Sequence, residues 1–260
     1  EAPLPRGSRR SVFDALEQVL PTVRLAWQHR MPLQLAALSR VVPGTTTGEH
    51  AVPCPPGRPP VRLRRVSDVT GRPDAQGVVE SPDGEVAAVV DLVLAHVREH
   101  PHESLAVVAL TRAHARRIAD AVRAALPERP ELAAFLRQRR RESFVVTDVE
   151  RCADTVRDAV VLSVGLGVSP LGRFVHRFGP LDDADGHRAL AAALTRARRR
   201  LTVVSCVAGE VLEPAKLTSP GAVALRDLLL ALEEPPSADA LDALRAARAR
   251  TAQPVGPPVT

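Results

Sequence analysis

Arginines that stand where a helix pattern meets a strand pattern have the clearest potential for chemistry in this sequence. Thr195-Arg196-Ala197-Arg198 ends a helical pattern and leads into an apolar strand pattern at residues 201–206. The planar guanidinium group of arginine binds phosphate oxygens in pairs and stabilises the charge that develops during phosphoryl transfer. Basic residues at the end of a helix also complement the helix dipole, and the pattern alone favours this simpler interpretation.

Motifs that define several other classes of site are absent from the sequence. No segment fits the GxxxxGK[ST] phosphate loop, no apolar strand ends in the Asp-Glu pair that holds Mg²⁺, and no GxSxG turn anchors a hydrolase triad. Gly165 and Gly167 follow an apolar strand, but the third glycine of a dinucleotide fingerprint is missing. Cys54, Cys152 and Cys206 lie too far apart to predict a zinc site, so we expect reduced thiols in a cytoplasmic protein.

The composition fits a globular protein from a GC-rich, bacterial genome. The chain has 260 residues, of which 45% are hydrophobic and 25% charged. No apolar run reaches the roughly 18 residues needed to cross a bilayer, so we expect no membrane segment. Asparagine and tyrosine are absent, and Lys216 is the only lysine among 35 basic residues. The net charge of +5 and the pI near 10.2 therefore permit nucleic-acid binding without establishing it.

Short apolar strands alternate with amphipathic helices along the middle of the chain, which predicts βαβ units and an α/β fold with a mainly parallel sheet. We expect strands at 61–66, 77–80, 105–110, 144–148, 159–164 and 201–206, and helices at 85–100, 112–126, 130–140, 186–198 and 221–233. Other predicted elements are a helix at 11–20, a strand at 22–27, a helix from Pro32, a hairpin arm at 173–178 and a helix at 238–250. We expect a loose N-terminus over 1–10, one domain over 11–233, and a Pro/Ala-rich helical tail or linker over 234–260.

Four blocks of sequence occur in a fixed order along the chain. They are Trp27-Gln-His-Arg-Met-Pro32, Ser104-Leu-Ala-Val-Val-Ala-Leu-Thr111, residues 144–167 with Arg157-Asp158 and Ser163-Val-Gly165, and residues 178–198 with Phe178-Gly-Pro-Leu181 and Thr195-Arg196-Ala197. Together they resemble the motifs of the second RecA-like domain of superfamily 1 helicases. The resemblance is to the branch that contains the helicases of nonsense-mediated decay and DNA replication, and most of all to large helicase-like ATPases of actinobacteria. It covers residues 11 to 233.

This resemblance implies a RecA-like domain, which is a three-layer sandwich of the P-loop NTPase type. It implies that Arg196 is the arginine finger that touches the γ-phosphate of ATP, that Arg30 is a further catalytic arginine, and that Arg157 also faces the nucleotide. ATP and Mg²⁺ are implied as cofactors. Their main ligands would come from a preceding RecA-like domain, in the same chain or in another, since this chain has no phosphate loop.

The resemblance also implies a nucleic-acid partner. Thr111, Ser163 and Gly165 fall on positions that face the backbone of a single-stranded nucleic acid, with DNA favoured. With 2% aromatic residues the chain has little capacity for base stacking, so we expect phosphate contacts to dominate and binding to depend on salt.

The sequence departs from the helicase motifs at positions that matter for ATP hydrolysis. Where the family has Gln-Gly-Asp-Glu, this chain has Ala153-Asp154-Thr155-Val156, and two motif residues near Arg196 are alanines, Ala189 and Ala191. The chain alone is therefore not expected to hydrolyse ATP. An inactive helicase-like domain that acts as a binding scaffold is the alternative. A nuclease or a small-molecule enzyme has no supporting carboxylate cluster or nucleophile.

Overall fold

A parallel β-sheet forms the centre of the computed structural model, which describes residues 16, 19–21, 27–32, 50–52, 60–71, 73–138 and 142–233. The sheet has five strands in the order β3-β9-β7-β5-β6, and all neighbouring strands are parallel. The strands are β3 Val61–Arg65, β5 Leu105–Ala109, β6 Val145–Asp148, β7 Arg157–Ser163 and β9 Ala197–Ser205.

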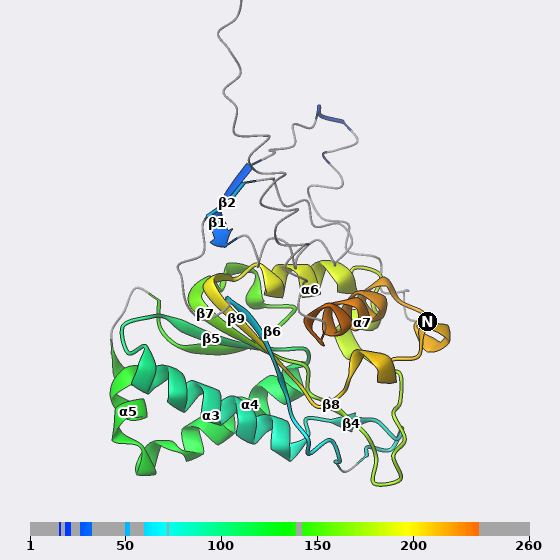
Figure 1. The fold of residues 1–260 in the computed structure, drawn as a ribbon, viewed down its shortest axis with the longest axis horizontal. Helices are drawn as coiled ribbons and strands as arrows, with labels where there is room; N and C mark the ends of the chain where they lie inside the picture. The colour runs from blue at the N-terminus through cyan, green and yellow to red at the C-terminus, as the bar shows by residue number, and fades with distance from the viewer. Residues whose placement is uncertain are drawn as a thin grey trace, which may run out of the picture.

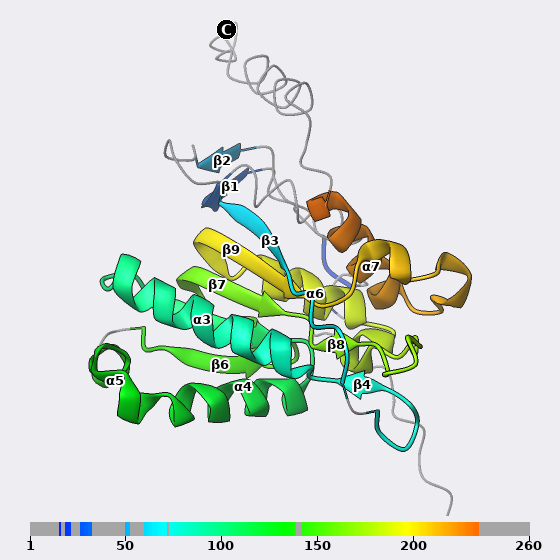
Figure 2. The same cartoon turned by 60° about the horizontal axis from the view of Figure 1, so that its bottom comes forward.

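Helices cover both faces of this sheet (Figures 1 and 2). One face packs against α3 Asp83–Glu99, α4 Arg112–Ala124 and α5 Pro130–Arg137. The other packs against α6 Gly186–Leu194 and α7 Pro220–Glu233. The predicted α/β three-layer sandwich with a parallel sheet is therefore confirmed, and this arrangement is consistent with the predicted RecA-like type.

Strand β5 shows why a central strand of this sheet is a continuous run of apolar residues in the sequence. Leu105, Val107 and Ala109 pack into the apolar cluster beneath α3, α4 and α5, whereas Ala106 and Val108 pack into the cluster beneath α6 and α7. Successive side chains of a strand point to opposite faces, so a strand with helices on both sides needs apolar residues at every position.

Short elements complete the described parts of the fold. The strands β1 Trp27–Pro32 and β2 His50–Val52 form a parallel pair, and β4 Val79–Glu80 pairs antiparallel with β8 Leu166–Gly167. The 3₁₀ turns are η1 Leu126–Glu128, η2 Cys152–Asp154, η3 Gly179–Asp182, η4 Gly209–Val211 and η5 Pro214–Lys216. No described helix combines the length and the apolar character needed to cross a membrane.

The structure corrects the prediction near the first motif block. The strand there is β1, Trp27–Pro32, and not residues 22–27, of which only Trp27 is described. Pro32 ends this strand, so the helix predicted to begin at Pro32 does not begin there; proline fits a strand end because it cannot donate a ladder hydrogen bond. The helices predicted at 11–20 and 238–250 lie outside the described residues, apart from Leu16, which is helical, and residues 19–20, which form a turn.

The hairpin arm predicted at 173–178 is wrong. The chain makes a tight turn in which Gly172 N donates to Ser169 O at 2.8 Å, and the following residues pair with no strand. Phe178 is instead an anchor: its side chain is 1% exposed, and its N–H donates to a carboxylate oxygen of Asp182 at 2.7 Å.

The boundary between α6 and β9 also differs from the prediction of one helix over 186–198. Helix α6 ends at Leu194, and Arg198 belongs to β9. Thr195 is the C-cap of the helix, and its hydroxyl donates to Ala192 O of the last turn at 2.9 Å. Arg196 therefore lies in a tight turn between helix and strand.

Candidate functional site

The candidate site residues from the helicase motifs divide between the two ends of β7. Arg157 begins this strand and Arg196 immediately precedes its neighbour β9, so both lie at the amino edge of the sheet. Ser163 ends β7, and Gly165 follows it at the carboxyl edge, where Thr111 also lies after β5. The structure thus separates the predicted nucleotide residues from the predicted nucleic-acid residues by the length of a strand.

Arg30 is the one predicted site residue for which only the backbone is described. It lies in β1, which contacts β9. Its predicted contact with a nucleotide stays a prediction.

Arg196 has its guanidinium group bound to the protein itself. Its Nε donates to Ala192 O at 2.9 Å and its Nη2 donates to the Thr195 hydroxyl at 3.0 Å. Its Nη1 donates to Ala153 O, in η2. This carbonyl belongs to residues 153–156, which stand where the resembled helicase motif has Gln-Gly-Asp-Glu. The side chain therefore clamps the altered motif to the end of α6.

Arg157 is also held by backbone oxygens. Its Nε donates to Ser143 O and its Nη1 to Val156 O, both at 2.9 Å. Its own N–H donates to Arg196 O at 3.1 Å, so the two arginines are neighbours although they come from different motifs. Burial lowers the pKa of the Arg157 guanidinium. These carbonyls hold both guanidinium groups in place and take part of their hydrogen-bonding capacity.

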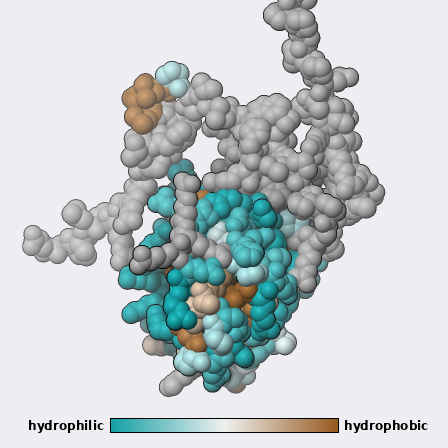
Figure 3. Space-filling model, turned by 90° about the vertical axis from the view of Figure 1, so that its left-hand side faces the viewer, coloured by the Kyte–Doolittle hydropathy of each residue, from teal (hydrophilic) through white to brown (hydrophobic). Residues whose placement is uncertain are grey.

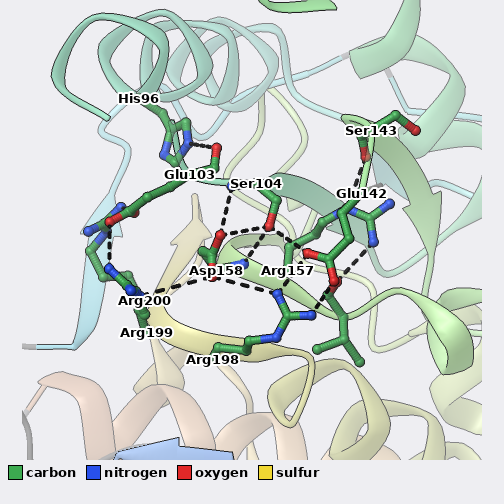
Figure 4. Close-up of polar contacts among 11 residues, drawn as sticks. His96, Glu103, Ser104, Glu142, Ser143, Arg157, Asp158, Arg198, Arg199 and Arg200 are labelled. Carbon is green, nitrogen blue, oxygen red and sulfur yellow. Dashed lines mark hydrogen bonds and ion pairs between the residues drawn. The ribbon is translucent and has the colours of Figure 1, made fainter. Parts of the chain in front are cut away.

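A network of carboxylates and arginines surrounds these residues at the amino edge (Figure 4). Arg198 makes a two-pronged ion pair with Glu142, with one of the hydrogen bonds at 2.7 Å. Ser104 joins both acids of the network, because its hydroxyl lies 2.9 Å from Glu142 and 2.9 Å from Asp158. Arg200 pairs with Glu103.

The molecular face in Figure 3, on the side of Figure 1 where α5 lies, is mostly hydrophilic around a small apolar area.

The electrostatics of this network favour charged side chains. Hydrogen bonds from Arg198 lower the pKa of Glu142 to about 2. Burial raises the pKa of Asp158, but hydrogen bonds from Ser104 and the charges of Arg198 and Arg199 outweigh that effect, and the pKa lies below its usual value. The three arginines at the start of β9 thus form ion pairs with acidic side chains of the same domain.

We expect the free energy of unfolding to fall less between pH 6 and pH 2 in Glu142→Gln than in the unmodified chain. Because the pKa of Glu142 is lower in the folded chain, its contribution is fully present above about 4.5 and is lost as the pH falls towards about 2. The side chain is 29% exposed, so we expect a contribution of about 1 kcal/mol after solvent screening. Urea unfolding between pH 6 and pH 2 measures this.

Glu213→Gln is the matched control for this acid-stability experiment, because Glu213 pairs with Lys216 where both side chains are more than half exposed. The hydrogen bond from Lys216 also lowers the pKa of Glu213, but solvent screens this exposed pair, so the control should change the slope of stability against pH less than Glu142→Gln does. Equal slopes for the unmodified chain and Glu142→Gln would contradict the assignment.

The carboxyl edge is built around a buried hydrogen-bonded chain. The Ser163 hydroxyl is fully buried; it donates to Glu85 Oε1 at 2.6 Å and lies 2.7 Å from His114 Nε2. His114 Nδ1 lies 2.6 Å from the Ser81 hydroxyl. Glu85 Oε1 also accepts from Gly165 N at 2.7 Å. Ser163 and Gly165 are therefore bonded inside the protein and not presented on its surface.

Thr111 lies nearer the solvent. Its hydroxyl caps α4 by accepting from His114 N at 3.2 Å, and it donates to the exposed carboxylate of Glu80. The first turns of α4 also carry the exposed side chains of Arg112 and Arg116. These groups form the accessible part of the carboxyl edge.

Sequence reasoning missed Glu85 and His114, although both leave a signal. Glu85 falls on the apolar face of α3 with Val89 and Val93, and His114 falls on the apolar face of α4 with Ile118. A carboxylate or an imidazole at helical spacing within an apolar stripe is buried, and a buried polar group needs partners. The sequence does not reveal that these partners are each other and Ser163.

The described residues do not complete a nucleotide site by themselves. The donors of Arg157 and Arg196 named above are bonded to protein oxygens, and no group of three or more potential metal-ligating side chains occurs in the described ranges. The residues present therefore do not fit ATP and Mg²⁺ without a contribution from elsewhere.

Comparison with known proteins gives a distant structural likeness. Over 68% of this chain and 87% of the other, the structure is similar to the C-terminal domain of a possible DNA helicase from Lactobacillus plantarum WCFS1, with 14% identity and a TM-score of 0.39. No protein-family model and no curated protein matches the chain. The case for a function rests on the chain's own motifs and geometry.

Proposed function

We propose that this chain is the second RecA-like domain of an ATP-dependent nucleic-acid helicase or translocase. The observation that supports this most is the neighbourhood of Arg157 and Arg196, joined by the 3.1 Å hydrogen bond from Arg157 N to Arg196 O. Two motifs that resemble the nucleotide-facing motifs of helicases thus meet at one edge of a parallel sheet. We propose residues 11–233 as the domain and a bacterial cytoplasmic setting.

On this proposal, the amino edge would face a partner RecA-like domain that carries the phosphate loop. Docking would free Arg196 from Ala153 O, and the guanidinium would then contact the γ-phosphate, with Arg30 and Arg157 beside it. ATP would supply the free energy for movement along nucleic acid. An arginine in this place stabilises the charge of the transferring phosphoryl group.

The carboxyl edge would bind the phosphate backbone of a single-stranded nucleic acid, with DNA favoured. The guanidinium groups of Arg112 and Arg116 are the accessible donors there, and the Thr111 hydroxyl would join them on leaving Glu80. Contacts of this kind are independent of base sequence and weaken as salt rises.

A binding experiment tests this assignment. We expect the chain to bind a fluorescent single-stranded DNA oligonucleotide, and the double variant Arg112→Ala/Arg116→Ala to bind several-fold more weakly. Loss of two phosphate contacts should reduce the slope of log affinity against log salt by about 1.4. Fluorescence anisotropy at several salt concentrations measures both quantities.

The matched control removes two exposed arginines from other places, with the same change in net charge. Arg98→Ala/Arg129→Ala alters the last turn of α3 and the residue before α5. It should change the affinity less and leave the slope nearly as it was. Equal losses in both double variants would mean that only total charge matters, which would contradict a site at the carboxyl edge.

ATP turnover gives a second test. The isolated chain with single-stranded DNA is expected to show no ATP turnover above background, because it has no phosphate loop. Strong turnover would contradict the proposal that half of the active site lies elsewhere.

An inactive helicase-like scaffold is the second candidate, and one observation favours it. The donors of Arg196 are bonded to Ala192 O, Ala153 O and the Thr195 hydroxyl, so the side chain already has a structural role. The stretch that would couple ATP to nucleic acid contains Ala153 in place of a conserved motif residue of the resembled family. In this case DNA or protein binding persists without any ATP turnover in the assembly.

A further inference from the structure

The turn after β7 is held by hydrogen bonds on both sides of one residue. Gly165 N donates to Glu85 Oε1 at 2.7 Å, and Gly165 O accepts from Ser81 N at 2.7 Å. Gly165 has a φ of +70°, and a Cβ at this position would lie 2.4 Å from His114 Cδ2. The turn is thus fixed in one conformation by residues from the start of α3 and from α4.

The partner of this turn is itself under conformational constraint. Ser81 has a φ of +59° and is the one non-glycine residue with positive φ in the described part of the chain. Such a backbone conformation is costly for a side chain with a Cβ and persists only where surrounding contacts hold it, often next to functional sites. Here the Ser81 hydroxyl reaches His114 Nδ1 and its N–H reaches Gly165 O.

The protons along the chain can be assigned from the number of donors. Ser163 donates its hydroxyl proton to Glu85, so its oxygen accepts from His114 Nε2–H. His114 Nδ1 then accepts from the Ser81 hydroxyl. Each hydrogen bond of the chain then has a donor and an acceptor, so the buried polar groups of this edge are satisfied by one another.

Glu85 accepts hydrogen bonds from residues at the ends of two different strands. Besides Ser163 and Gly165 it accepts from Cys206 N at 3.3 Å, at the end of β9. One fully buried carboxylate therefore joins the start of α3 to the ends of two sheet strands. A buried carboxylate is costly to desolvate and is retained where its hydrogen bonds define a structure.

We propose that Glu85 is a positioning residue for nucleic-acid binding, acting through the Ser163–Gly165 turn and His114. This inference rests on the proposed function of the carboxyl edge. Glu85 fixes the turn; His114 carries that constraint to Thr111, whose hydroxyl accepts from His114 N. Ser163 and Gly165 thus support the binding surface from below, and the phosphate contacts are made by the exposed arginines of α4, next to Thr111.

Glu85→Gln tests the proposal in the full chain, because it keeps the size of the side chain and removes the charge. A neutral amide accepts hydrogen bonds more weakly, and its NH₂ group cannot accept from Cys206 N. We expect about a tenfold loss of affinity for single-stranded DNA at a temperature where the variant is folded, as for the loss of one well-placed contact. Ser163→Ala, which interrupts the connection to His114, should give a smaller loss.

Ser219→Ala is the matched control for stability alone. The Ser219 hydroxyl is buried like that of Ser163, but it donates to Leu181 O at 2.8 Å and caps α7. This variant should lower the melting temperature and leave DNA affinity unchanged. A purely structural Glu85 would behave in the same way, which would overturn the proposal.

Hydrogen exchange gives a readout that needs no ligand. In Glu85→Gln the amide of Gly165 should exchange at least tenfold faster, whereas the amide of Val161, in the middle of β7, should keep its protection. Unchanged exchange at Gly165 would overturn the proposal. DNA binding by the unmodified chain and Glu85→Gln with equal affinity would overturn the positioning role alone, whereas no binding by the unmodified chain would overturn the proposed function together with it.

Discussion

Replacing Gly165 with alanine is expected to lower the free energy of unfolding by about 3–5 kcal/mol, among the largest effects of a single methyl group in this chain. Two causes add. A residue with a Cβ at a φ of +70° costs about 1–2 kcal/mol. The new Cβ would also lie 2.4 Å from the ring of His114, which is fully buried and held at both nitrogens. Urea unfolding followed by circular dichroism measures the change.

Gly172→Ala separates the two causes. Gly172 has nearly the same backbone conformation, with a φ of +73°, but nothing lies within 4 Å of the added Cβ. This variant should cost only the conformational part, about 1–2 kcal/mol. Equal losses at the two glycines would show that contact with His114 contributes nothing.

A double-mutant cycle tests the contact itself. His114→Ala removes the ring that the new methyl group would meet, although it also leaves Ser81 and Ser163 without a partner. We therefore expect Gly165→Ala to cost less in a His114→Ala background than in the unmodified chain, with a coupling of about 1–3 kcal/mol. Additive losses would place the strain somewhere else in the turn.

The sequence predicts the sheet and most helices well because their signals are local. The apolar runs at β5 and β7 and the amphipathic pattern of α3 each need only neighbouring residues to be recognised. The end of α6 was misplaced since an alanine-rich helix continues smoothly into the arginines of β9. The chain leaves the helix at Thr195 because the residues that follow pair with β7 in the sheet, which is a contact between distant parts of the sequence.

The motif resemblance singled out candidate residues and not their contacts, and the roles of these residues stay predictions. Motif resemblance identified Arg157 and Arg196, and the sheet brings them together as neighbours. It did not indicate that Arg196 would bond to Ala153 O, because that contact joins residues 43 positions apart in the sequence. In the same way, Glu85 and Gly165 are 80 positions apart. Pairing of buried polar groups across such distances is set by how strands and helices pack.

Arg196→Ala distinguishes a motor domain from a scaffold. In an assembly with an ATP-binding RecA-like partner domain, we expect this variant to lower DNA-stimulated ATP turnover about 10³-fold or more, the effect of removing an arginine that stabilises the transferring phosphoryl group. Arg196→Lys should restore little, since an ammonium group lacks the planar pair of donors. Phosphate release at saturating ATP and DNA measures turnover.

Arg198→Ala is the matched control for the turnover of Arg196→Ala. Arg198 lies two positions further along, pairs with Glu142, and is expected to matter for stability only. Its turnover per folded molecule should stay within a few-fold of the unmodified assembly. If Arg196→Ala also kept full turnover, Arg196 would be a structural clamp between η2 and α6 and not a catalytic group. If the unmodified assembly bound DNA but showed no turnover at all, the altered stretch at Ala153 would mark an inactive scaffold, in which the clamp is the function that this arginine retains.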